Sequence, residues 1–315
     1  MVRNPKIKNE GNKMENINIK APREDKRTRT FSWEEVSKYF FLLCSVLSIF
    51  FLLLICVFIF KDSIEFFGKV GVKDFILSDS WAPMNQPPTY GILSMILGSI
   101  IITALSCLGA VPVAIMVAAY LAFDCPKKFY KILKPGLNLM TGIPSIVYGF
   151  FALTIIVPIN KSIFGGNGMN ILSASILLLI MILPTIISMA EASLRTVPKS
   201  YYSGSLSLGA SHDETITRVM IPAARSGIFA GIILGIGRAI GETMAVILVA
   251  GNQTRLTLNP LKGIRTMTTN IVLEMAYAAG DHRQALIATA GVLFIFILII
   301  NTSFFIVKNR REKND

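Results

Sequence analysis

The stretch SGIFAGIILGIGRAIGETMAVILVA, residues 226–250, is built almost wholly from apolar and small residues, yet it contains Arg238 and Glu242. A helix of about 20 apolar residues crosses the roughly 30 Å hydrocarbon core of a bilayer. The stretch is therefore long enough to cross a membrane. What surrounds its two charged side chains becomes the main question about the chain.

Five further apolar runs of similar length lie at residues 39–60, 92–121, 136–158, 171–190 and 285–307. Only 16% of the 315 residues are charged, against about 25% in soluble domains. Helices and closed barrels are the structures that satisfy every backbone polar group in lipid, and these runs are too long for barrel strands. We therefore predict an all-α, polytopic membrane protein with six transmembrane helices.

The basic residues predict the orientation of these helices. If the N-terminus is cytoplasmic, 22 of the 31 Lys and Arg residues lie in cytoplasmic segments and 8 lie in extracytoplasmic ones. This asymmetry follows the positive-inside rule and predicts a cell-membrane protein with both termini in the cytoplasm. The net charge of +12 then reflects topology, with the lipid bilayer as surroundings, and does not indicate nucleic-acid binding.

This topology divides the chain into a polar tail, a first helix, a loop and a larger core. The core contains five transmembrane helices and a cytoplasmic loop, residues 191–225. The predicted segments are a cytoplasmic tail at 1–38, a helix at 39–60, an extracytoplasmic loop at 61–91, the core at 92–307 and a second cytoplasmic tail at 308–315.

The cytoplasmic loop 191–225 keeps helical periodicity and predicts two short helices. Gly209 is placed where the first helix ends, because glycine tolerates the left-handed conformation of a helix C-terminus. Ser211 and Glu214 have the spacing of a capping box at the start of the second helix, and Pro222 ends or kinks that helix. Such an element suits a docking knob for a partner, or equally an amphipathic loop packed on its own bundle.

Arg238 lies near the middle of its span, where a charge costs at least about 2.5–3.5 kcal/mol on insertion scales. Its side chain must therefore face the protein interior or water. Glu242 follows at i+4, so we expect both side chains on one helix face. One interpretation is a buried ion pair that joins helices. The other is a substrate path, in which arginine binds a passing oxyanion and Glu242 accepts a hydrogen bond from a protonated one, such as phosphate.

Glycine and proline predict two features of helix geometry. Gly231 and Gly235 continue a four-residue repeat, and Gly241 forms a second pair with Gly237. Small residues at this spacing allow two helix backbones to approach closely. Gly142 and Pro144 break the third helix, which either shapes a cavity or only kinks the helix.

The sequence contains no motif for catalysis or metal binding. It has no G-x-x-x-x-G-K-[ST] loop for ATP phosphates, and its four cysteines lack metal-ligand spacing. His212 and His282 are distant from each other and from clusters of carboxylates in the sequence. We therefore expect no catalytic residue and no metal site, so active transport would draw on an ion gradient or on a partner.

Four stretches resemble a known family. GSLSLGASHDETITRVMIP, residues 204–222, is similar to the cytoplasmic EAA loop of ABC importer permeases, with Gly209 and Pro222 at the family's separation. The EAA triplet itself is replaced by residues 203–205, which are Ser, Gly and Ser, so its glutamate is missing. SWAPMNQPPTYGI (80–92), GIPSIVYGF (142–150) and GRAIGETMAV (237–246) resemble the C-type permeases of phosphate-specific importers.

The resemblance implies a type I, MetI-like permease core and a set of partners. These are a second, A-type permease subunit, a dimer of ATP-binding subunits, and an extracytoplasmic phosphate-binding protein. ATP and Mg would bind to the ATPase, and this chain would carry no cofactor. The residues implicated are Arg238 and Glu242 in the substrate path, and Gly209, Ala210, Ile221 and Pro222 in the loop that couples to the ATPase.

Three alternative functions are considered. A sister permease for molybdate or sulfate would share the fold, although the GIPSIVYG and GETMAV stretches favour phosphate. An ion-coupled secondary carrier would transport without partners, and it predicts an internal repeat of broken helices, which the sequence does not show. A membrane-embedded signalling or scaffold protein would carry out no transport.

Overall fold

The computed structural model describes residues 33–312, with side chains for residues 36–306. Of the described residues, those from 33 to 54 belong to one unit and those from 55 to 312 to a second. Helix α1, Trp33–Val70, begins in the first unit, and its side chains from Val36 to Leu54 are exposed and mostly apolar. The predicted tail 1–38 lies outside the described residues as far as residue 32, and residues 33–38 belong to α1.

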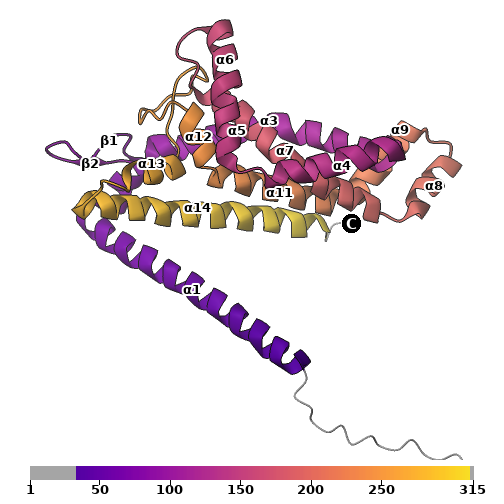
Figure 1. Ribbon diagram of the computed structural model, residues 1–315, viewed down its shortest axis with the longest axis horizontal. Helices are drawn as coiled ribbons and strands as arrows, with labels where there is room; N and C mark the ends of the chain where they lie inside the picture. Colours follow the sequence, from indigo (N-terminus) through magenta and orange to yellow (C-terminus); the bar gives the residue numbers. More distant parts are fainter. Residues whose placement is uncertain (1–32, 313–315) are drawn as a thin grey trace, which may run out of the picture. The chain divides into compact units, whose positions relative to one another are not determined.

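The second unit is almost entirely helical, with one short two-stranded sheet (Figure 1). Strands β1 and β2 pair antiparallel, with Trp81 opposite Tyr90. Three five-residue π-helical turns, labelled η, interrupt the helices. The elements after α1 are α2 (Val72–Leu77), β1 (Trp81–Ala82), β2 (Thr89–Tyr90), α3 (Leu93–Ala119), η1 (Tyr120–Asp124), α4 (Lys127–Gly142), α5 (Ser145–Phe151), η2 (Ala152–Ile156), α6 (Val157–Phe164), α7 (Ile171–Thr196), α8 (Lys199–Ser207), α9 (His212–Thr215), η3 (Ile216–Met220), α10 (Ile221–Ala223), α11 (Arg225–Gly241), α12 (Met244–Val249), α13 (Met267–Glu274) and α14 (Gly280–Glu312).

Helix α7 is the centre of the larger core, and α3 and α11 pack along it (Figure 1). Small and polar residues at these contacts bring the backbones together. The Ser106 hydroxyl of α3, for example, donates to the Ser175 carbonyl of α7 at 3.0 Å. Leu177, Leu178, Met181, Ile182 and Ile186 of α7 are at most 2% exposed. This bundle supports the site described below.

A second core lies at the end of the bundle that carries β1, β2 and α13, opposite the end with α8 and α9 (Figure 1). Phe66 packs edge-on against both Phe75 and Tyr90. Burial raises the pKa of the Tyr90 phenol above its usual value. The loop between α1 and α3 is therefore anchored by its aromatic residues.

The helices include five that are long and apolar enough to cross a membrane, and six if α9–α10 and α11, which bend by 71°, count as one span. This agrees with a multi-pass, all-α protein. The five are Val36–Val70, Leu93–Asp124, Ser145–Phe164, Ile171–Thr196 and Gly280–Ile306.

The predicted third span, 136–158, begins too early. Helix α4 ends at Gly142, and Ile143 is extended with φ −67° and ψ 129°. The cause is Pro144, since a proline ring disfavours the helical conformation of the residue before it. The apolar helix of spanning length starts after this break, at Ser145.

Other boundaries also differ from the predicted ones. Residues 61–70 continue α1, and residues 191–196 continue α7, so the two predicted loops 61–91 and 191–225 begin later than expected. Charged residues end a hydropathic run without ending a helix, which explains both differences. The predicted fifth span, 226–250, is not one helix, because α11 ends at Gly241 and α12 starts at Met244.

Candidate translocation site and coupling loop

Arg238 lies in the last turn of α11 and is partly buried. Its Nη1 atom donates to the Thr185 hydroxyl of α7 at 3.3 Å. The side chain borders a cavity of about 640 Å³ between α7, α11 and α14. The other residues lining this cavity are Ala230, Ile233, Leu234, Gly237, Asn301 and Phe305.

The charge of this cavity is positive. Among the residues that line it, Arg238 is the ionised one, and Thr185 and Asn301 supply neutral polar groups. Within the described side chains no carboxylate forms an ion pair with Arg238. The guanidinium therefore keeps donors that an anion entering the cavity can use.

Glu242 does not share a helix face with Arg238, so that prediction is wrong. The backbone of Glu242 is extended, with φ −70° and ψ 133°, because α11 has already ended at Gly241. Its Oε1 atom accepts a hydrogen bond from the Ala245 N–H at 3.1 Å, at the start of α12. Its carbonyl accepts one from the Thr268 hydroxyl of α13 at 3.0 Å. Glu242 thus holds the break between α11 and α12.

Two of the three glycines predicted to pack helices do so within this chain. A Cβ added to Gly231 would lie 2.8 Å from the Cβ of Met189, and one on Gly235 would lie 2.8 Å from the Ile186 side chain. Both neighbours belong to α7. A Cβ on Gly241 would meet no atom of the described chain within 4 Å, and the same holds for Gly237. The second glycine pair therefore has no packing role among the described residues.

The helix that follows the break at Gly142 and Pro144 packs against a second family-like stretch. The Tyr148 hydroxyl donates to the Met140 carbonyl at 2.7 Å and so bridges the break between α4 and α5. Gly149 of α5 faces α12, since a Cβ there would lie 2.8 Å from the Cα of Ala245. GIPSIVYG therefore lies against GETMAV, and the contact is at Ala245, three residues after Glu242.

The predicted turn within the loop 191–225 is confirmed. Gly209 has φ +89°. The N–H of Ala210 bonds to the Ser205 carbonyl and the N–H of Gly209 to the Leu206 carbonyl, which is the Schellman pattern. Ser211 and Glu214 form both bonds of the capping box at the start of α9. The loop is thus a locally specified helix–glycine–helix element.

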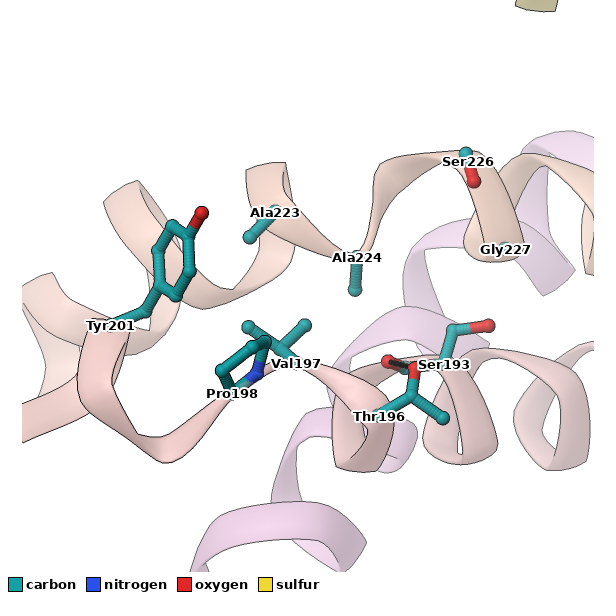
Figure 2. Close-up of a pocket in the computed structure, with 9 residues that line it drawn as sticks. All are labelled: Ser193, Thr196, Val197, Pro198, Tyr201, Ala223, Ala224, Ser226 and Gly227. Atoms are coloured by element: carbon teal, nitrogen blue, oxygen red, sulfur yellow. Dashed lines mark hydrogen bonds between the residues drawn. The ribbon is translucent and has the colours of Figure 1, made fainter.

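Ile221 and Pro222 lie in α10, between the π-helical turn η3 and α11. Ile221 packs on the larger core, whereas Pro222 is exposed. The chain then bends by 71° into α11, with Ala224 at the corner. A cavity of about 410 Å³ lies inside this bend (Figure 2). Figure 2 shows Val197 and Pro198 on one side of it, facing Ala223 and Ala224 on the other.

Each histidine contacts one carboxylate, which lies 88 residues away in the sequence for His212 and 8 residues away for His282. His212 Nε2 lies 2.6 Å from Asp124 Oδ1, and His282 Nε2 lies 2.8 Å from Glu274 Oε2. Among the described residues no group of three or more His, Cys, Asp or Glu could hold a metal ion.

Residues 110–313 match the family described as binding-protein-dependent transport system inner membrane component. The chain belongs to this family. As such a permease it is a transport subunit and not an enzyme, and ATP hydrolysis resides on separate subunits of these ABC importers.

The permease has relatives along most of its length. It is 36% identical over 266 residues to the probable ABC transporter permease protein YqgH of Bacillus subtilis (strain 168), covering 82% of this chain and 86% of that protein. It is 32% identical over 247 residues to the phosphate transport system permease protein PstC of Mesorhizobium japonicum (strain LMG 29417 / CECT 9101 / MAFF 303099), covering 72% and 75%.

Solved structures show the same fold. The inward-facing MetNI methionine ABC transporter superposes with a TM-score of 0.56 at 17% identity, over 70% of the permease and 95% of that chain. A bacterial ABC transporter that imports alginate superposes with a TM-score of 0.58 at 14% identity, over 88% and 98%. The predicted all-α, MetI-like permease fold is confirmed.

The permease contains two clusters of charged side chains that its sequence did not predict. Glu191 of α7 has a side chain only 2% exposed. It accepts hydrogen bonds from Lys134 at 2.6 Å, from Tyr130 at 2.9 Å and from Arg195. Arg195 also donates to the Leu121 carbonyl at 2.7 Å. This cluster fastens α4 and η1 to the end of α7. Its only sequence signal is a carboxylate immediately after an apolar run.

The second cluster surrounds Glu274 at the other end of the bundle. Glu274 accepts hydrogen bonds from the Trp81 indole at 2.9 Å and from Arg265 at 2.5 Å, besides its contact with His282. Arg265 in turn donates to the Asn252 carbonyl at 3.1 Å. The cluster joins β1, α13 and α14. No local pattern could indicate it, because Trp81 and Glu274 are 193 residues apart.

Proposed function

We propose that this chain is the C-type permease subunit of an ATP-driven importer of inorganic phosphate, and that it forms the translocation path with a second, A-type permease subunit. The single observation that carries the proposal is the position of Arg238. Its guanidinium borders a cavity of about 640 Å³ with a hydroxyl and an amide nearby, and it has no ion pair with a carboxylate among the described side chains. This suits a small oxyanion.

Phosphate is favoured for two reasons, one at the Arg238 cavity and one at Glu242, which lies outside the lining of that cavity. The planar fork of arginine matches the oxygens of a phosphate group. Near neutral pH phosphate still carries a proton, so its P–OH group can donate a hydrogen bond to the Glu242 carboxylate in the path. Sulfate has no such proton. Glu242 uses Oε1 for the Ala245 N–H, so we assign the hydrogen bond from phosphate to Oε2. The relatives named phosphate transport system permease support the same substrate.

The orientation and partners follow from the same proposal. We place both termini and the loop of α8–α10 in the cytoplasm, because the positive-inside rule favours it. Residues Gly209, Ala210, Ile221 and Pro222 would then couple to a dimer of ATP-binding subunits. The β1–β2 end would face an extracytoplasmic phosphate-binding protein. ATP and Mg would bind to the ATPase, with no cofactor on this chain.

The test is transport by the reconstituted complex. The two permeases and the ATPase are placed in proteoliposomes with ATP on the loop side and the binding protein on the other side. We expect uptake of radiolabelled phosphate that requires both additions and that excess sulfate or molybdate does not reduce. Preferred uptake of molybdate or sulfate would instead assign the chain to a sister oxyanion importer. Transport by the purified chain alone would indicate a secondary carrier.

A further inference from the structure

Three side chains from three elements meet where the loop of α8–α10 contacts η1. Asp124 is the last residue of η1, the turn that directly continues α3. Tyr202 belongs to α8, and His212 is the first residue of α9. His212 Nε2 lies 2.6 Å from Asp124 Oδ1, and His212 Nδ1 lies 2.6 Å from the Tyr202 hydroxyl. Both ring nitrogens are therefore engaged, which fixes the orientation of the imidazole.

Aromatic stacking strengthens the same junction. The ring of Phe123, next to Asp124, stacks on the ring of Tyr202, with centroids 6.1 Å apart and planes 7° from parallel. The Ser205 and Thr215 hydroxyls, 2.9 Å apart, join α8 to α9. Two adjacent residues at the end of η1 thus contact both helices of the loop, and these helices are bonded to each other.

Cavities border α8 in two places, and one of about 460 Å³ lies beside Phe123 and Tyr202 of the junction itself. The other lies where α8 approaches α10. There the cavity of about 410 Å³ separates Pro198 and Tyr201 from Ala223 and Ala224 (Figure 2). A movement of α8 and α9 can be absorbed in this space. At the His212 junction the same movement would act directly on η1, which continues α3. Helix α3 packs on α7 and α11, the two helices that supply Thr185 and Arg238.

We propose that His212 is a positioning residue for energy coupling: through Asp124 and Tyr202 it joins the ATPase-coupling loop to α3, so that displacement of the loop moves the helices around the Arg238 cavity. This inference rests on the proposed function, because it takes the loop of α8–α10 to be the ATPase contact. It adds a route by which a displacement at the ATPase contact is transmitted to the substrate path.

The exposure of the junction makes it testable. The side chains of His212 and Asp124 are 41% and 43% exposed, and exposed ion pairs contribute little to folding stability. Substitutions here should therefore leave the fold and the assembly of the complex intact. A change in transport can then be assigned to transmission and not to unfolding.

The experiment measures substrate imported per ATP hydrolysed in the reconstituted complex, for His212→Ala, His212→Gln, Asp124→Asn and Tyr202→Phe. We expect His212→Ala to keep ATPase co-purification and ATP hydrolysis but to lower the ratio by roughly fivefold or more, as for typical coupling between sites. His212→Gln should recover part of it. Ser207→Ala is the matched control, since Ser207 lies in α8, is exposed and bonds to Ser203 of its own helix.

Two results would overturn the inference. One is a wild-type ratio in both His212→Ala and Asp124→Asn. The other is loss of ATPase co-purification in these variants, which would make the junction a docking determinant. If the wild-type complex transports another oxyanion, the proposed substrate fails, but the same ratio measured with that anion still decides the role of His212.

Discussion

Arg238 and Glu242 are separated by the end of a helix: Arg238 in the last turn of α11 donates to Thr185, and Glu242 accepts from the Ala245 N–H in the first turn of α12. Although they are four residues apart in the sequence, the two side chains have different roles. The arginine keeps its charge available at a cavity, and the glutamate stabilises the break that ends the helix beside it.

Removing the guanidinium should slow transport with little effect on folding. A hydrogen bond to a charged group contributes about 1.5–3 kcal/mol, so Arg238→Ala should lower the initial rate of uptake by roughly 10–100-fold. Arg238→Lys should lose less, since it keeps the charge but not the planar fork. Leu234→Met, in the lining of the same cavity, is the control. A silent Arg238→Ala would favour a signalling or scaffold role.

Neutralising Glu242 should change selectivity more than stability. In Glu242→Gln the amide oxygen can still accept the Ala245 N–H, so we expect a folded complex. Without the carboxylate, protonated phosphate loses its acceptor, and excess sulfate should compete better. The check is phosphate uptake with increasing sulfate across a range of pH. Unchanged anion preference would remove Glu242 from the substrate path.

The glycines of α11 should separate into two classes. Gly231→Ala places a Cβ 2.8 Å from that of Met189 and should destabilise the chain by about 1–3 kcal/mol through overpacking. Gly237→Ala meets no described atom and should be neutral, or stabilise α11 by up to about 1 kcal/mol. Thermal unfolding of the purified chain in detergent measures both. If Gly237→Ala instead impairs assembly with the second permease, Gly237 lies at that interface.

The Glu274 cluster should be a large contributor to stability. Glu274 is 7% exposed, and Glu274→Ala leaves Arg265 without its carboxylate, which should destabilise by about 3–5 kcal/mol. Trp81→Phe removes a single indole donor and should cost only about 1–3 kcal/mol. Protease sensitivity of the loop around β1 gives an independent measure. Equal effects of the two substitutions would contradict a cluster centred on Glu274.

The sequence predicted best where a feature depends on residues close together. Gly209 and the Ser211–Glu214 box adopt the predicted conformations, because the conformational freedom of glycine and the reach of a serine side chain are local properties. The apolar runs predicted the helices for a similar reason. Hydropathy reports the length of a segment in lipid and does not depend on its neighbours.

Features that depend on tertiary structure were missed. The break after Gly241 lies within a hydropathic run that appears continuous, and it is held by Thr268, which lies 26 residues further along the chain. The partners of Glu191 lie on α4 as well as on its own helix. Pro144 did carry a local signal for the end of α4, and hydropathy alone placed that boundary wrongly.

The contact of Gly149 with Ala245 has a consequence for engineering and for evolution. Neither segment can be enlarged at this contact without displacing the other, so the two stretches must vary together despite the 86 residues, 151–236, between them. A chimaera that takes residues 142–150 from one homologous transporter and 237–246 from another should fold poorly, whereas exchanging both together should preserve the fit.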